Sequence, residues 1–206
     1  MKIGNWKLSP YGRSAAGRKI KSGFTMIELL IVIAVLGILA VAVLAAINPI
    51  EQINRGKDTG SRSDAEQLIG AVDRFYTANG YYPWQTGPTD TTHTSTGWIA
   101  VGATWVRVGA PGVDVLGELS GTGTSEVKES FTNRITATGY NTIFVYNRGT
   151  QGDSTYVCFA PKSANFVTEA GTRCTATKPL DYPTASACDQ AADGDCGAGG
   201  DCICLP

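Results

Sequence analysis

One carboxylate stands at the start of an apolar run that is long enough to cross a membrane. Glu28 is followed by nineteen residues, Leu29–Ile47, without a charged or strongly polar side chain. As a helix, that run spans about 28 Å at ~1.5 Å per residue, close to the ~30 Å hydrocarbon core of a bilayer. A carboxylate in a bilayer costs about 2.5–3.5 kcal/mol at mid-depth and less toward the end of the span. We therefore expect a cation to offset the charge of Glu28.

A cut between Gly23 and Phe24 would supply that cation. The new α-amino group of Phe24 would stand one helical turn from Glu28, or would face the Glu28 of a neighbouring subunit. Such a pair relieves two charges that are each unfavourable in lipid. Two simpler interpretations are an ordinary secretory signal peptide and an uncleaved anchor. Neither explains why a Gly-Phe pair precedes an acid at this spacing.

Residues 21–47 resemble the class III signal of type IV pilins and pseudopilins. Gly23, Phe24 and Glu28 match the three signal positions of that family, and Gly37 is a weaker match. The resemblance implies that a membrane-embedded prepilin peptidase cleaves after Gly23 and methylates Phe24. It also implies that the inner-membrane assembly platform moves the N-terminal helix from lipid into a helical filament, where Phe24 and Glu28 register adjacent subunits.

By this resemblance the chain is a structural subunit of a type IV pilus and not an enzyme. Its partners are other copies of itself or other pilins, the peptidase, the assembly platform, and membrane lipid before assembly. The alternative within the family is a pseudopilin of a type II secretion or DNA-uptake system. The alternative from another class is a membrane-anchored enzyme outside the cytoplasm.

The chain divides by composition into four segments. They are a basic leader peptide that is removed (1–23), a transmembrane and filament-core helix (24–48), an amphipathic second half of that helix (49–80), and a β-rich head with a cysteine-rich C-terminal region (81–206). The leader carries six basic side chains and no acid. Because basic flanks stay on the cytoplasmic side, we expect a single inner-membrane span with the head outside, which later enters a pilus or pseudopilus.

Removal of the leader changes the charge of the chain. It leaves 11 Lys and Arg against 18 Asp and Glu, a net charge of −7. Sequence-independent binding to phosphates relies on clustered cations. We therefore expect no intrinsic nucleic-acid binding.

The helical pattern changes character at Asn48-Pro49, where proline removes a backbone hydrogen bond and favours a kink. Residues 54–64 lack a large apolar side chain and contain two glycines, so this stretch is either a polar helix or partly melted. Apolar residues then recur at helical spacing, at Ala65, Leu68, Val72 and Phe75. Asn79-Gly80 is a typical helix end.

The remaining pattern predicts an α+β fold, in which the long N-terminal helix packs on a small antiparallel β-sheet head, as in pilins. The segments that we expect to form strands are Trp98–Val101, Thr104–Val108, Thr142–Tyr146, Thr155–Phe159 and Asn165–Glu169. Val113–Leu119 and Ser125–Asn133 are ambiguous and are interpreted as helical turns. The Thr-rich stretch 85–97 is interpreted as a solvated connector, with a glycosylated patch as the alternative.

Six cysteines lie in the last quarter of the chain: Cys158, Cys174, Cys188, Cys196, Cys202 and Cys204. An even number outside the cytoplasm predicts disulfides, although six cysteines allow fifteen connectivities. A zinc site is the alternative, but the spacing is not C-x2-C and the only histidine, His93, is distant in sequence.

The acidic residues of the tail raise a question about metal binding. Asp189, Asp193, Asp195 and Asp201 offer oxygen ligands that suit calcium, and major pseudopilins carry calcium sites in their C-terminal region. No calcium-loop pattern is completed, so we expect no cofactor and interpret the tail as a solvated acidic loop. His93 likewise lacks a nucleophile with a supporting signature, which leaves no catalytic constellation.

Overall fold

The computed structural model describes residues 23–102, 105, 114–121, 125–188 and 201–206. It consists of two units that divide between Ile47 and Asn48. The first unit contains helix α1 (Met26–Ala46), which is apolar along its length and has no buried residue. By length and composition, α1 is able to cross a membrane.

The second unit begins with helix α2 (Pro49–Asn79). Asn48 caps it, because the Asn48 side chain accepts a hydrogen bond from the Glu51 N–H. A proline at the first helical position has no N–H to lose, and it disfavours helical backbone at the residue before it. Proline therefore separates two helices here, where the sequence analysis considered a kink in one continuous rod. Helix α2 ends at Gly80, whose φ of 77° is left-handed, as Asn79-Gly80 predicts.

The polar stretch 54–64 is helical throughout, which settles the choice that the sequence left open. Three of its polar residues, Asp58, Ser61 and Asp64, continue the buried stripe of α2, while most of the others are exposed. The buried residues of α2 are Asp58, Ser61, Asp64, Ala65, Leu68, Ala71, Val72 and Phe75. Their spacing of three and four residues places them on one side of the helix.

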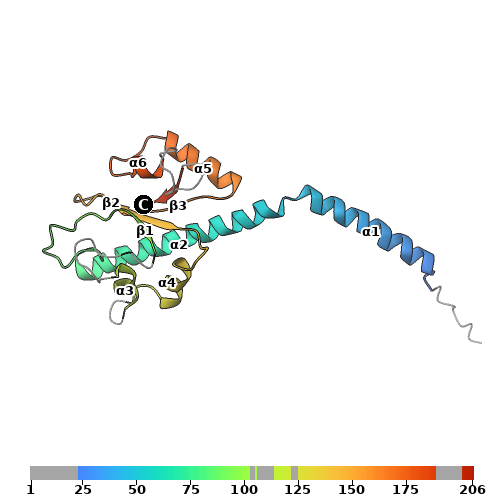
Figure 1. Cartoon of the computed structure of the whole chain (residues 1–206), viewed down its shortest axis with the longest axis horizontal. Coiled ribbons are helices and arrows are strands. Elements are labelled where there is room, and N and C mark those ends of the chain that lie inside the picture. The colour runs from blue at the N-terminus through green and yellow to red at the C-terminus, as the bar shows by residue number, and fades with distance from the viewer. Residues whose placement is uncertain (1–22, 103–104, 106–113, 122–124, 189–200) are drawn as a thin grey trace, which may run out of the picture. The chain divides into compact units, whose positions relative to one another are not determined.

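Four antiparallel strands form one sheet in the order β1 (Gly97–Val101), β2 (Ile143–Asn147), β3 (Tyr156–Phe159) and β4 (Ile203–Leu205). The first three confirm predicted strands, whereas β4 was not predicted. The predicted strand 104–108 lies outside the described residues except for Trp105. This sheet and the apolar N-terminal helix make up the expected α+β, pilin-like arrangement (Figure 1).

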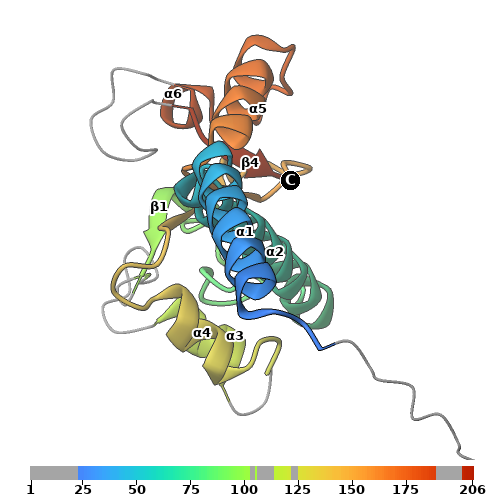
Figure 2. The same cartoon turned by 90° about the vertical axis from the view of Figure 1, so that its right-hand side faces the viewer.

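Short helices complete the head: α3 (Val115–Ser120), α4 (Glu129–Ile135) and α6 (Thr184–Ala187). The first two lie where the sequence predicted helical turns. Within the head, the sheet lies along α2, and α3 and α4 lie next to each other beside α2 (Figure 2).

The two faces of the sheet enter different cores. Ile143 and Val145 of β2 belong to the main core with α2, whereas Phe144 between them belongs to a second cluster. That second cluster contains Tyr156, Cys158, Ala187, Cys202 and Cys204. Alternate side chains of a strand point to opposite faces, so the C-terminal segment covers the side of the sheet that α2 leaves open.

The prediction of a strand at 165–169 is wrong, because these residues belong to helix α5 (Ala164–Thr175). Asp58 is fully buried, and although it belongs to α2, its carboxylate caps the start of α5. Its carboxylate accepts hydrogen bonds from the Ser163 N–H at 2.7 Å, the Ser163 hydroxyl at 2.6 Å and the Lys162 N–H at 3.0 Å. Glu51 accepts a further bond from the Ala164 N–H at 2.9 Å. A long-range cap therefore favours helix over the strand that the local sequence suggests.

A second inward carboxylate, Asp64, joins α2 to α4. Arg134 donates to Asp64 Oδ1 at 2.5 Å, and the Tyr140 hydroxyl donates to Asp64 Oδ2. Burial, and the hydrogen bond to the Asp64 anion, raise the pKa of Tyr140 to about 12. The polar first half of α2 is thus held by hydrogen bonds, and its second half by apolar packing.

Candidate processing and assembly site

Both residues of the predicted cleavage junction are exposed. The side chain of Phe24 is 88% exposed, and no atom lies within 4 Å of the position that a Cβ on Gly23 would take. Helical backbone begins two residues later, at Met26. The junction is therefore an extended segment directly before a helix.

Thr25 and Glu28 form a reciprocal cap at the start of α1. The Thr25 hydroxyl accepts a hydrogen bond from the Glu28 N–H at 3.2 Å. In return, Glu28 Oε2 accepts bonds from the Thr25 N–H at 2.8 Å and the Thr25 hydroxyl at 2.7 Å. This capping box satisfies backbone donors that the first turn of a helix otherwise leaves free.

The cap explains how Glu28 is accommodated while the leader is still attached. The carboxylate accepts two hydrogen bonds from Thr25, and it lies at the positive end of the helix dipole, where an anion is stabilised. The pairing of Glu28 with the Phe24 amine is not needed for this arrangement and stays a prediction. Sequence reasoning missed Thr25, although the pattern Thr-x-x-Glu before an apolar run is a known sign of a capping box.

The apolar side chains of α1 surround the helix on all sides. From Leu29 to Leu44 its large hydrophobic residues are each about half exposed or more, with Ile38 at 72% and Val32 at 49%. Isolated exposed hydrophobics are ordinary, but a continuous surface of this kind needs a partner, either lipid or other helices. Membrane insertion and helix-bundle assembly both satisfy that requirement.

The comparison with family models gives one match. Residues 18–44 match the model of the prokaryotic N-terminal methylation motif. The N-terminus carries the type IV pilin and pseudopilin signal. No curated protein and no solved structure matches the chain.

The pilin-type signal supports a type IV pilin or pseudopilin precursor and points to a structural subunit rather than an enzyme. It implies processing by prepilin peptidase and assembly into filaments. Together with α1, it fits a pilin anchored in the inner membrane with its head in the periplasm. Gly23, Phe24 and Glu28 all lie inside the matched residues.

Disulfides hold the C-terminal part of the head. Cys158 is bonded to Cys204, its register partner across β3 and β4, and Cys174 is bonded to Cys188. Cys202 is disulfide-bonded as well, and Cys196 lies outside the described residues. Sulfur atoms in disulfides are not available as thiolates, so the zinc alternative fails for these five cysteines.

The calcium prediction falls largely on residues that the structure does not describe, namely Asp189, Asp193 and Asp195. Asp201 is described, and its carboxylate lies within 4.8 Å of the sulfurs of Cys174 and Cys188. Because that sulfur pair is oxidised, the three groups do not make a thiolate metal site. Calcium binding by the tail stays a prediction.

His93, the histidine considered for catalysis, belongs to a loop organised by Asp90. Asp90 accepts hydrogen bonds from the N–H groups of Thr86 at 2.9 Å, Thr92 at 2.9 Å and His93 at 3.1 Å. His93 Nδ1 also lies 2.8 Å from Asp90 Oδ2. These bonds, that of the Thr86 N–H first, hold the pKa of Asp90 well below its usual value of 3.8. Asp90 thus holds the loop together through these hydrogen bonds, and we call this arrangement the loop clamp.

Proposed function

We propose that this chain is the structural subunit of a type IV pilus, made as a prepilin, cleaved after Gly23, methylated on Phe24 and assembled through α1. The match of residues 18–44 to the methylation motif carries this proposal. The exposed junction and the apolar surface of α1 support it, since a peptidase needs an accessible bond and a filament core needs an apolar helix.

Assembly moves α1 from lipid to a bundle of identical helices. Both environments are apolar and exclude water, so the apolar surface of α1 stays covered. Cleavage converts the Phe24 N–H into a cation, four residues before Glu28. In the bundle, this amine and the Glu28 carboxylate of an adjacent subunit form a charge pair away from water, where each charge alone is costly. Thr25 keeps the carboxylate at the helix start until the amine of a neighbour reaches it.

The processing half of the proposal is tested by intact mass and N-terminal sequencing of the mature protein. We expect Phe24 at the N-terminus with one added methyl group, and a mass that lacks residues 1–23. Electron microscopy of sheared surface material then tests for fibres. A mature protein that begins at Met1 rejects the proposal, and processed protein without fibres favours a pseudopilin.

The assembly role of Glu28 is tested with two substitutions. Glu28→Gln keeps a side-chain oxygen that accepts the bonds from Thr25 but removes the charge, whereas Glu28→Ala removes both. If the charge pair drives registration, both variants are inserted and cleaved, and both lose about tenfold or more in fibre yield. Fibre yield from Glu28→Gln at the wild-type level would show that the charge is not required.

A further inference from the structure

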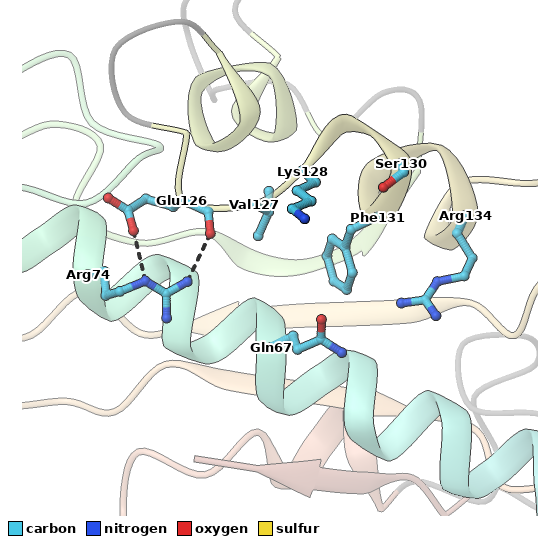
Figure 3. A pocket seen from close by; sticks show the side chains of 8 residues that line it. All are labelled: Gln67, Arg74, Glu126, Val127, Lys128, Ser130, Phe131 and Arg134. Carbon is cyan, nitrogen blue, oxygen red and sulfur yellow. Dashed lines mark hydrogen bonds and ion pairs between the residues drawn. The ribbon is translucent and has the colours of Figure 1, made fainter.

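A groove on the head gathers cationic side chains on a chain that is otherwise acidic. It has a volume of about 620 Å³ and lies between α2 and the segment that leads into α4. Figure 3 shows Gln67 and Arg74 on one wall, and Lys128, Phe131 and Arg134 on the other. Arg74, Lys128 and Arg134 are three of the eleven Lys and Arg residues that remain after the leader is removed.

Two of these cations are fixed in position. Arg74 donates from Nε to the Glu126 carboxylate at 2.8 Å and from Nη2 to the Glu126 carbonyl at 2.9 Å. A Cβ on Gly70 would lie only 3.2 Å from Arg74 Nη1, so a glycine one turn away leaves room for this guanidinium. Arg134 is held by Asp64. Because these two side chains are already fixed, they lose little conformational entropy when a partner binds.

The third cation, Lys128, is exposed, and its side-chain amino group has no hydrogen bond or ion pair within the described part of the chain. In Figure 3 its amino group points toward the space above Gln67 and beside Phe131. The acids at the groove, Glu126 and Asp64, are engaged by the two arginines. The groove therefore offers the positive charge of Lys128, which neither acid neutralises, next to the aromatic ring of Phe131.

A surface of opposite charge lies on α2, the helix that also forms one wall of the groove. Glu66 and Asp73 are exposed, and neither side chain has a hydrogen bond or ion pair with any other described residue. Seven residues separate them, so they lie on the same side of α2, about 10 Å apart along its axis. We call these two residues the acidic stripe. Gln67 and Arg74 follow them directly in sequence, which places the stripe about 100° around the helix from the groove wall.

A helical filament requires two different patches on each subunit, because every subunit contacts its neighbours head to tail. We propose that the groove of one subunit receives the acidic stripe of a second copy, with Lys128 facing Asp73. This inference rests on the proposed filament function. It is supported by the opposite charges of the two patches, and by the lack of side-chain partners for Lys128, Glu66 and Asp73 among the residues that the structure describes. The net charge of −7 also makes a local cationic groove the complementary surface for a second copy.

A charge swap in the full-length chain tests the contact. We expect Lys128→Glu alone, and Asp73→Lys alone, to lower fibre yield about tenfold, because each places like charges opposite one another. The double variant Lys128→Glu/Asp73→Lys restores the opposite pairing across the interface and should recover most of the yield. Lys162→Glu is the matched control, since Lys162 is an exposed lysine of the head outside the groove.

Processing and folding are measured in every variant by intact mass and by tryptophan fluorescence, so that a loss of fibres is not mistaken for misfolding. Wild-type fibre yield from Lys128→Glu, or no recovery in the double variant, overturns the docking proposal and leaves the pilus function in place. A processed wild-type chain that forms no fibres rejects the pilus function instead.

Discussion

Glu28 and Asp58 both stabilise the start of a helix, but they do so over very different distances along the chain. Glu28 caps its own helix through Thr25, three residues away, and is exposed. Asp58 is fully buried and caps α5, whose first residues lie more than a hundred positions further along the sequence.

The contrast shows which region depends on the fold and which does not. The cap of α1 needs only four consecutive residues, so it does not depend on the fold of the head. The cap of α5 exists only when α2, Ser163 and the sheet are all in place. The start of α1 is thus stabilised locally, whereas the start of α5 is stabilised only in the folded head.

The largest effect is expected from Asp58→Ala, which breaks the long-range cap. It leaves the Lys162 and Ser163 N–H groups and the Ser163 hydroxyl without their buried acceptor. We expect a loss of about 3 kcal/mol in the free energy of unfolding, because hydrogen bonds to a buried charged group are worth about 1.5–3 kcal/mol each and part of the loss is recovered by water. Urea unfolding followed by the fluorescence of the buried Trp84 and Trp105 measures it.

Asp58→Asn sharpens this test, because the amide keeps one acceptor of the same shape. We expect it to lose less stability than Asp58→Ala. Equal unfolding midpoints for wild type and Asp58→Ala would mean that α5 does not depend on this carboxylate, and the contrast between the two caps would fail.

A smaller effect is expected from Thr25→Ala, which breaks the local cap. Removal of an N-cap side chain costs about 1 kcal/mol, and here the cost should stay within the first turn of α1. Hydrogen exchange in detergent should show faster exchange of the Glu28 amide, with no change in the urea midpoint of the head. Thr25→Ser keeps the hydroxyl and should retain protection. A shift of the head midpoint in Thr25→Ala would contradict the independence of the two units.

The smallest effect is expected at Asp90, a carboxylate inside the head whose hydrogen bonds are all local. Its pKa in the folded chain is held below 3.8, first by the Thr86 N–H. The unfolded chain therefore binds the proton first as pH falls, so the stability that Asp90 contributes is present above about pH 4 and is lost on acidification. We expect the urea midpoint to fall less between about pH 5 and pH 3 in Asp90→Asn than in wild type. If the urea midpoint fell equally with pH in wild type and Asp90→Asn, the result would argue against the loop clamp.

The features that the sequence predicted correctly are those that depend on near neighbours. The apolar run predicts α1 without reference to any other part of the chain, and Gly80 ends α2 because its backbone is left-handed. The strands β1, β2 and β3 follow from alternating apolar residues. The signal at residues 18–44 is local as well, and this is why it is readable in a single sequence.

The features that were missed depend on distant partners. Residues 165–169 have strand-like side chains, but Asp58 and Glu51 accept hydrogen bonds from the Ser163 and Ala164 N–H groups just before them, and Arg62 lies 4.8 Å above the ring of Phe166. Strand β4 has only three residues and is fixed to β3 by the Cys158–Cys204 bond, whose connectivity the sequence does not reveal. The groove could not be predicted, because Lys128 and Arg74 are distant in sequence and line one groove only in the folded head.

The long-range partners of α2 set an order of events during synthesis. Asp58 and Asp64 emerge 105 and 70 residues before Ser163 and Arg134, the groups that satisfy them. At about 5–20 residues per second, the ribosome takes about 5–20 s to add 105 residues. Until Ser163 has been added, Asp58 lacks the groups that satisfy its carboxylate in the folded head. The cap of α5 therefore forms only after Ser163 has been added to the chain.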